Sequence, residues 1–384
     1  MSLFSYSILS IDGGGIRGII PCTILSEIEK RTQKPIAESF DLIAGTSTGG
    51  ILASGLTIKD EAGKPKFPAS ELLHLYKGEK GKKIFKKPMR LLNKARLLFK
   101  PLYESKNISE VLINQFGKAR LKNSYTDLLI TSYDTHNKKP FYFRSRLAKQ
   151  QQEEDFDICD VCRSTSAAPT YFPPKLLPYM GRHAVNKSKD VSLIDGGVFA
   201  NNPSMLAYVE AQELWRKDPA YKRQFKMRTD ELLANKDMAA APNPDNFAPP
   251  ILLISLGTGR TQKLYNHKET KGWGVKWIRP LIDILMQGVS ESTHYQMQYM
   301  LPPYEDNSGV AHPRYYRLNI DIEAQFSEMD DTSDATLSQL EQYGKDIVMK
   351  YDKEIDEICK LLEFVAMERE ERSFMEEEME NPEV

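Results

Sequence analysis

The sequence predicts an α/β fold, in which a mostly parallel central sheet is covered by helices on both faces in a three-layer α/β/α arrangement. Short apolar runs alternate with helical patterns from residue 6 to about residue 300, which is the first observation behind this prediction. The second is that two glycine-framed segments, DGGGIRG at residues 12–18 and GTSTG at residues 45–49, each separate an apolar run from a helical pattern. Because ligands bind beyond the carboxyl ends of parallel strands, we expect both segments to lie at a site.

The predicted elements follow the chain in order. Strands are expected where apolar residues cluster, at residues 6–11, 40–44, 126–133, 140–143, 191–194 and 251–256. Helices are expected where the pattern is helical, at residues 19–31, 51–57, 157–166, 203–217 and 275–301. These elements form one domain over residues 1–330, with a basic insertion at about 77–106 and a surface excursion at about 218–250. Residues 331–384 are expected to add an amphipathic helix at 337–365 and a frayed acidic tail.

Composition excludes several classes of protein. The chain has 384 residues, 41% of them apolar, and a formal net charge of −1, which fits a globular protein and argues against binding to a DNA or RNA duplex. Neither a run of about eighteen apolar residues nor a basic-then-apolar N-terminus is present, so no membrane span and no secretory signal are predicted. Cys159 and Cys162 form one C-x-x-C pair without the further ligands of a zinc site. These features predict a soluble protein of a reducing compartment, the cytoplasm.

The first glycine segment matches the spacing of a dinucleotide fingerprint, with glycines at positions 13, 15 and 18. That fingerprint requires an acidic residue at the end of the next strand, whereas Asp41 opens that strand and Ser47 follows its end. No GK[ST] follows either glycine segment, so a nucleotide-triphosphate loop is also disfavoured. The remaining interpretation is a run of backbone N–H groups at a helix start, which suits the binding of negative charge.

The second glycine segment has the G-x-S-x-G form of a nucleophile elbow, with Ser47 as the exposed hydroxyl. Its other interpretation is a tight turn in which Ser47 caps a helix. A serine nucleophile needs a base, and none of the six histidines lies in a recognisable motif after a late strand. Asp195 does follow a late strand, within Asp-Gly-Gly at residues 195–197. An ordinary aspartate, with a pKa of about 3.9, is a weak base at neutral pH, so this dyad requires a special environment or a strong oxyanion hole.

Five segments, taken together and in this order, resemble the patatin-like phospholipase family. They lie at residues 12–18, 45–49, 164–174 (STSAAPTYFPP), 195–197 and 254–259 (ISLGTG), and the resemblance spans roughly residues 6 to 320. It implies a patatin-like three-layer fold and a serine–aspartate lipid acyl hydrolase that needs no metal and no cofactor. It further implies that Ser47 is the nucleophile and Asp195 the base. The oxyanion hole implied by the match consists of the backbone N–H groups of Gly13, Gly14 and Gly15, with Arg17 steadying the loop.

Three functional hypotheses follow. The leading one is a phospholipase A that cleaves acyl esters of membrane glycerophospholipids, peripheral to the inner face of the membrane and docked on anionic lipid through the basic segment at 77–106. The second adds, by analogy with similar bacterial proteins, an antiviral effector role that degrades the membrane of its own cell after a cyclic oligonucleotide activator binds. The third is a non-catalytic module that binds lipid or phosphate. A homo-oligomer formed through the helix at 337–365 is compatible with each of them.

Overall fold

A central sheet organises the described part of the chain, which in this computed structural model comprises residues 6–86, 100–179, 190–217, 251–262, 265–272, 274, 277–305 and 311–380. Residues 87–99 of the predicted basic insertion lie outside the described residues, as does the predicted excursion at 218–250. No helix within the described ranges is both long enough and apolar enough to cross a membrane.

The sheet has eight strands in the order β11-β7-β1-β2-β3-β6-β5, with β4 also paired to β3. The parallel part consists of β11 (Tyr315–Leu318), β7 (Ile251–Leu256), β1 (Tyr6–Ile11), β2 (Leu42–Thr46) and β3 (Asp127–Asp134). The antiparallel part consists of β4 (Lys139–Arg144), β6 (Asp190–Asp195) and β5 (Lys175–Pro178). The predicted mostly parallel sheet is therefore confirmed. Two short pairs lie outside it: β8 (Arg260–Thr261) with β12 (Asp321–Ile322), and β9 (Tyr304–Glu305) with β10 (Ala311–His312).

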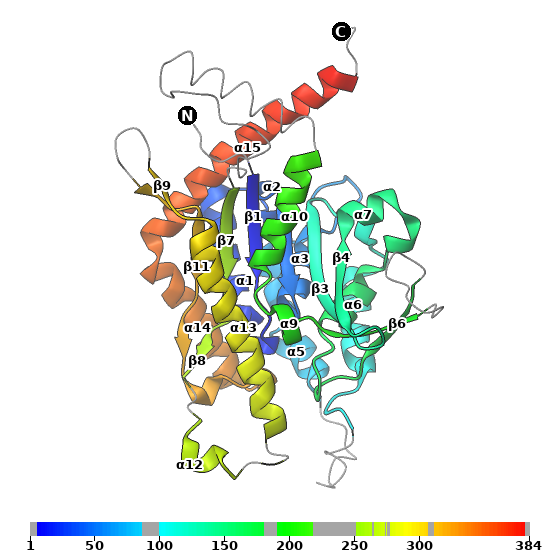
Figure 1. The fold of residues 1–384 in the computed structure, drawn as a ribbon, viewed down its shortest axis with the longest axis vertical. Coiled ribbons are helices and arrows are strands. Elements are labelled where there is room, and N and C mark those ends of the chain that lie inside the picture. Colours follow the sequence, from blue (N-terminus) through cyan, green and yellow to red (C-terminus); the bar gives the residue numbers. More distant parts are fainter. Residues whose placement is uncertain are drawn as a thin grey trace.

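Helices cover both faces of this sheet (Figure 1). Alternate residues of β1 point to opposite faces, so Leu9 belongs to one apolar core and Ile8 to the other. The first core includes residues of α1 (Ile19–Thr32), α3 (Thr48–Thr57), α6 (Ser105–Phe116), α8 (Ile158–Thr165) and α14 (Asp334–Lys350). The second core includes residues of α10 (Ser204–Lys217) and α13 (Ile278–Met300), which cross in front of the sheet in Figure 1. The remaining helices are α2 (Ile36–Ser39), α4 (Ala69–Leu72), α5 (Gly78–Ile84), α7 (Ser145–Gln150), α9 (Gly197–Ala200), α12 (His267–Thr270) and α15 (Asp352–Glu380).

The C-terminal region differs from its prediction. The helical pattern at 337–365 is divided between α14 and α15, which meet at Tyr351 with φ −110° and ψ 30°. Arg31 of α1 holds the start of the second helix, since its guanidinium donates to the carboxylates of Asp352 and Asp356 at 2.7 and 2.6 Å. Helix α15 continues to Glu380, through the part of the chain predicted as an acidic tail. Both helices pack against α1, so the apolar residues of α14 and of α15 contact the same helix on either side of the break.

Gly344 provides a test of the contact between α14 and α1. A Cβ at this position would lie 2.7 Å from the Cβ of Thr23, so Gly344→Ala forces the helices apart. Gly288 in α13 is the matched control, since a Cβ there meets nothing within 4 Å. We expect urea unfolding to give Gly344→Ala a free energy of unfolding about 1–3 kcal/mol below that of Gly288→Ala. Equal values for the two variants would contradict the close helix contact.

Candidate active site

Ser47 occupies the turn between β2 and α3. Its φ of 55° and ψ of −122° are rare for a residue with a side chain. Both flanking glycines are sterically required: a Cβ at Gly45 would lie 2.3 Å from the Gly49 carbonyl oxygen, and a Cβ at Gly49 would lie 2.2 Å from that of Ile11. The strained residue is held by its backbone N–H, which donates to Thr165 Oγ1 at 2.8 Å. The turn therefore has the backbone conformation of a nucleophile elbow.

Asp195 reaches the same place from the antiparallel part of the sheet. The register pairs Thr46 of β2 with Thr131 of β3, and the next residue, Ser132, with Asp195. Because β6 runs against β3, its last residue arrives level with the end of β2. The prediction that Asp195 ends a late strand is confirmed, although β6 does not run parallel to the strands that end at this edge.

The carboxylate of Asp195 is deeply buried, with a relative exposure of 2%. Its Oδ1 accepts a hydrogen bond from the Gly197 N–H at 2.7 Å, while Oδ2 makes no hydrogen bond of standard geometry with a described residue. Burial raises the pKa of Asp195 to about 7, against the opposing effects of the Ser47 hydroxyl and the Gly197 amide. Its buried environment therefore makes the Asp195 carboxylate a stronger base at neutral pH than an ordinary aspartate.

The glycine loop after β1 lies beside this pair, since a Cβ at Gly13 would be 3.1 Å from that of Ser47. The Gly13 N–H donates to the Asn201 carbonyl at 3.0 Å, so it is not free to bind an oxyanion. The amides of Gly14 and Gly15 make no hydrogen bond with another described residue. Gly15 has a φ of 60°, which favours glycine.

Arg17, which the sequence analysis expects to steady this loop, contacts it directly. Its Nε donates to the Gly14 carbonyl at 3.2 Å, and its side chain is buried. Burial lowers the pKa of Arg17, against the effect of nearby acidic groups that include Asp283. Thr258 fixes the preceding peptide, since its hydroxyl donates to the Gly13 carbonyl at 2.7 Å.

A pocket opens over the serine and the aspartate. Its walls are mainly apolar and come from α3, α5, α6, α13 and the segments after α8 and β12. The lining residues are Gly15, Ile16, Ser47, Thr48, Ile51, Leu75, Tyr76, Ile84, Phe85, Ile108, Ser166, Ala168, Tyr171, Phe172, Asp195, Met286 and Met329. Apolar walls of this kind suit an apolar group whose polar end reaches Ser47. No histidine is among the lining residues, and no group of three or more potential metal ligands occurs in the part of the chain that the structure describes.

A family model described as Patatin-like phospholipase matches residues 9–208, which include Ser47, Asp195 and the glycine loop. The chain belongs to this family. Its members are lipid acyl hydrolases, so the protein is an enzyme of the carboxylic ester hydrolase class. Patatin-like protein 1 of Arabidopsis thaliana is 32% identical over 358 residues, which cover 88% of this chain and 80% of the relative. Patatin-T5 of Solanum tuberosum is 32% identical over 380 residues, which cover 93% and 89% of the two chains.

A third relative shows that overall sequence identity does not distinguish active from inactive patatins. It is named "Probable inactive patatin-3-Kuras 1" of Solanum tuberosum, and it is 32% identical across 90% of this chain and 86% of its own. A relative whose name denotes loss of activity is therefore as similar overall as the others. The roles of individual residues in this patatin-like enzyme must be argued from the geometry of the site.

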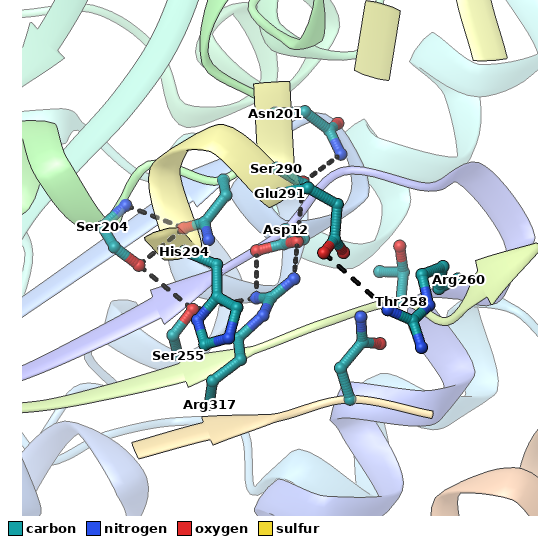
Figure 2. A network of polar contacts seen from close by, with 12 residues as sticks. Asp12, Asn201, Ser204, Ser255, Thr258, Arg260, Ser290, Glu291, His294 and Arg317 are labelled. Carbon is teal, nitrogen blue, oxygen red and sulfur yellow. Dashed lines mark hydrogen bonds and ion pairs between the residues drawn. The ribbon is translucent and has the colours of Figure 1, made fainter. Parts of the chain in front are cut away.

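A buried ion pair lies beneath the glycine loop of this patatin-like enzyme (Figure 2). Arg317 of β11 donates from Nη1 and Nη2 to the two carboxylate oxygens of Asp12, at 2.8 and 2.6 Å. Arg317 Nη1 also donates to Ser255 Oγ of β7, while Ser290 Oγ of α13 donates to Asp12 Oδ2 at 3.0 Å. Burial opposes the charge on Arg317, but the Asp12 carboxylate outweighs it and raises the pKa of Arg317 above its usual range. The two parallel N–H···O contacts make the pair bidentate.

Asn201 joins this network to the segment that carries Asp195. Its Nδ2 donates to Ser290 Oγ at 3.1 Å and to the Gly13 carbonyl at 3.4 Å, while its own carbonyl accepts the Gly13 N–H. The residue follows Asp195 by one short helix, α9. The loop with the free amides and the segment with the base are thus held to each other through Asn201, by both its side chain and its backbone carbonyl.

The sequence analysis missed Arg317, Ser290 and Asn201 as parts of the site. Ser290 gives no local signal within its helical pattern. Arg317 gives a weak signal, because it is a lone charge in the short run Tyr-Tyr-Arg-Leu at 315–318. A charge within a buried strand requires a partner, but its sequence does not say which one.

Arg317→Met should lower the free energy of unfolding by about 3–5 kcal/mol, because it leaves the Asp12 carboxylate buried without its cation. Arg260→Met is the matched control, since Arg260 is 48% exposed and pairs with Asp321 at the surface, where the expected loss is about 0–1 kcal/mol. Arg317→Lys keeps the charge but not the bidentate geometry, so its loss in free energy of unfolding should lie between those of the two methionine variants. Urea unfolding measures all three. An equal loss for both methionine variants would show that the buried pair does not anchor the loop.

Proposed function

We propose that this enzyme is a phospholipase of the A type, which cleaves fatty-acyl esters of membrane glycerophospholipids with Ser47 and Asp195 as its catalytic dyad. The observation that carries the proposal is that both side chains line one apolar pocket. The pocket has the apolar lining that a fatty-acyl chain requires, and Gly15 of the glycine loop lines it together with Ser47 and Asp195.

The reaction follows from these positions. The Ser47 hydroxyl attacks the ester carbonyl, and Asp195 accepts its proton through a carboxylate whose pKa of about 7 suits this transfer. The amides of Gly14 and Gly15 stabilise the oxyanion, since the Gly13 amide is already bonded to Asn201. The lysophospholipid alcohol leaves with the proton from Asp195. Water, deprotonated by the same carboxylate, then releases the fatty acid and restores Ser47.

The finer predictions from the sequence are part of the same proposal. Activation by a cyclic oligonucleotide and an antiviral role rest on the analogy with bacterial patatin-like proteins. The third hypothesis, a non-catalytic lipid or phosphate-binding module, is disfavoured because a pure binder has no use for a strained serine beside a buried carboxylate. Lipid-product analysis with and without a panel of cyclic oligonucleotides distinguishes these possibilities.

Ser47→Ala should abolish release of fatty acid from phospholipid vesicles, by a factor on the order of 10⁴ or more. A fluorophosphonate probe should label the wild type and leave the variant unlabelled, because the probe reacts with the activated hydroxyl. Ser166→Ala is the control, since Ser166 lines the same pocket and has no role in the proposed chemistry. Labelling of wild type and Ser47→Ala to the same extent, in the presence of the activator panel, would contradict Ser47 as the nucleophile.

The pKa of Asp195 predicts the acid limb of the activity. The value of kcat/KM for a soluble ester should fall tenfold per pH unit below an apparent pKa near 7, because only the ionised carboxylate accepts the proton of Ser47. A limb near pH 4 would mean that Asp195 is not the base, or that it is not perturbed.

The same shift makes a prediction for stability. The pKa of Asp195 is higher in the folded protein than in the unfolded chain, so the folded state loses stability as pH rises from about 4 to about 7. Asp195→Asn should therefore be more stable than the wild type at pH 8, on the order of 1–4 kcal/mol, with no difference near pH 4. Asp321→Asn is the control of opposite sign, because a hydrogen bond from Arg260 lowers the pKa of Asp321. Urea unfolding at both pH values measures the effect, and a pH-independent difference for Asp195→Asn would contradict it.

A further inference from the structure

The first half of α13 exposes a cluster of large apolar side chains. Leu281, Ile284 and Leu285 are 47%, 40% and 43% exposed. They are spaced by three and four positions, so they share one face of the helix, and the half-buried Trp277 precedes Leu281 by one turn. We call these four residues the α13 face. Exposed apolar clusters of this kind mark surfaces that bind another apolar surface.

The α13 face lies on the same turns of the helix as one wall residue of the catalytic pocket. Met286, the next residue after Leu285, is buried and lines that pocket beside Ser47 and Asp195. The same turns of α13 therefore present one side to the pocket and the other to solvent. Figure 1 shows the N-terminal end of α13 and α12 projecting at the lower end of the molecule, where α5 and α9 also lie.

The charges around the α13 face suit an anionic lipid surface. Lys268 and Lys271, in and directly after α12, are exposed on the chain that leads into Trp277. Apolar residues with an aromatic side chain at one end and lysines beside them are typical of a helix that lies in a membrane interface.

The basic segment at 77–106 fits this role less well in its described parts. Several of its lysines are ion-paired within the protein. Lys77 pairs with Glu341, Lys82 with Asp334 at 3.2 Å, Lys83 with Glu110 at 2.7 Å and Lys106 with Glu110 at 3.7 Å. Cations that are already paired contribute less to attraction toward anionic lipid.

We infer that the α13 face inserts into the surface of a phospholipid bilayer and so holds the catalytic pocket close to its substrate. This inference rests on the proposed function for its biological purpose, but membrane binding by the α13 face is a separate property. Insertion of this face would hold the enzyme at the membrane, which would favour lipid in membranes over dispersed ester.

The test separates binding from catalysis. Binding is measured with Ser47→Ala protein, which leaves the lipid intact. The assay is flotation with vesicles of phosphatidylcholine and phosphatidylglycerol in a ratio of about 7:3, which gives an anionic surface. Adding Leu281→Ser and Leu285→Ser should weaken the partition coefficient by about 10- to 100-fold. Ile284→Trp should strengthen it, because tryptophan favours the interface.

Two tyrosines at the other end of the same helix provide the matched control. Tyr295 and Tyr299 are 62% and 70% exposed, and Tyr295→Ser with Tyr299→Ser should leave vesicle binding unchanged. In the active enzyme, the Leu281→Ser and Leu285→Ser pair should reduce hydrolysis of vesicles and leave hydrolysis of p-nitrophenyl butyrate unchanged.

Each outcome has one meaning. Wild-type binding by the leucine double variant overturns the inference, as does an equal loss in the tyrosine control. A wild-type dimer that the leucine changes dissociate, with vesicle binding intact, assigns the α13 face to a second copy of the chain and also overturns the inference. Failure of wild type to hydrolyse either substrate, with the activator panel present, defeats the proposed function, while the flotation result still decides the role of the α13 face.

Discussion

The buried pair of Asp12 and Arg317 is the interaction on which the site depends. It links the loop after β1 to β11 across the intervening strand β7, whose Ser255 hydroxyl accepts from the same guanidinium. The side chains are only 3% and 8% exposed, so removing either partner would leave an unpaired charge in the protein. Because the glycines that follow Asp12 have no side chains, contacts from neighbouring residues such as Asp12 set the position of their amides.

The groups proposed for catalysis come from two segments that are each under local constraint. The positive φ of Ser47 is stabilised by Thr165, and the glycines around it exclude any side chain. Asp195 lies at the end of an antiparallel strand, where burial raises its pKa toward neutrality. Asn201 then ties its segment to Gly13 and Ser290. Strain and buried charge are concentrated here because the surrounding cores on both faces of the sheet are well packed and stabilise them.

Helix α13 connects the parts of this arrangement. Ser290 supports the Asp12 carboxylate, Met286 forms part of the pocket wall, and the residues on the opposite side of the helix form the exposed α13 face. One rigid element therefore contacts the oxyanion loop, the acyl-chain pocket and solvent. A substrate surface that binds this helix would be placed directly next to the reacting groups.

The sequence by itself determined the strands β1 and β7 to the residue, the two glycine turns, and Ser47 and Asp195 as candidates, because periodicity and turn chemistry are local properties. It could not determine the antiparallel course of β6, the break at Tyr351, or the loss of the Gly13 amide to Asn201. Only the tertiary structure brought Ser290 and Arg317 to Asp12, across 278 and 305 positions of the chain. It also decided which face of α13 is exposed and how basic Asp195 becomes. These properties depend on burial and on distant partners, and neither is encoded in the residues next to them.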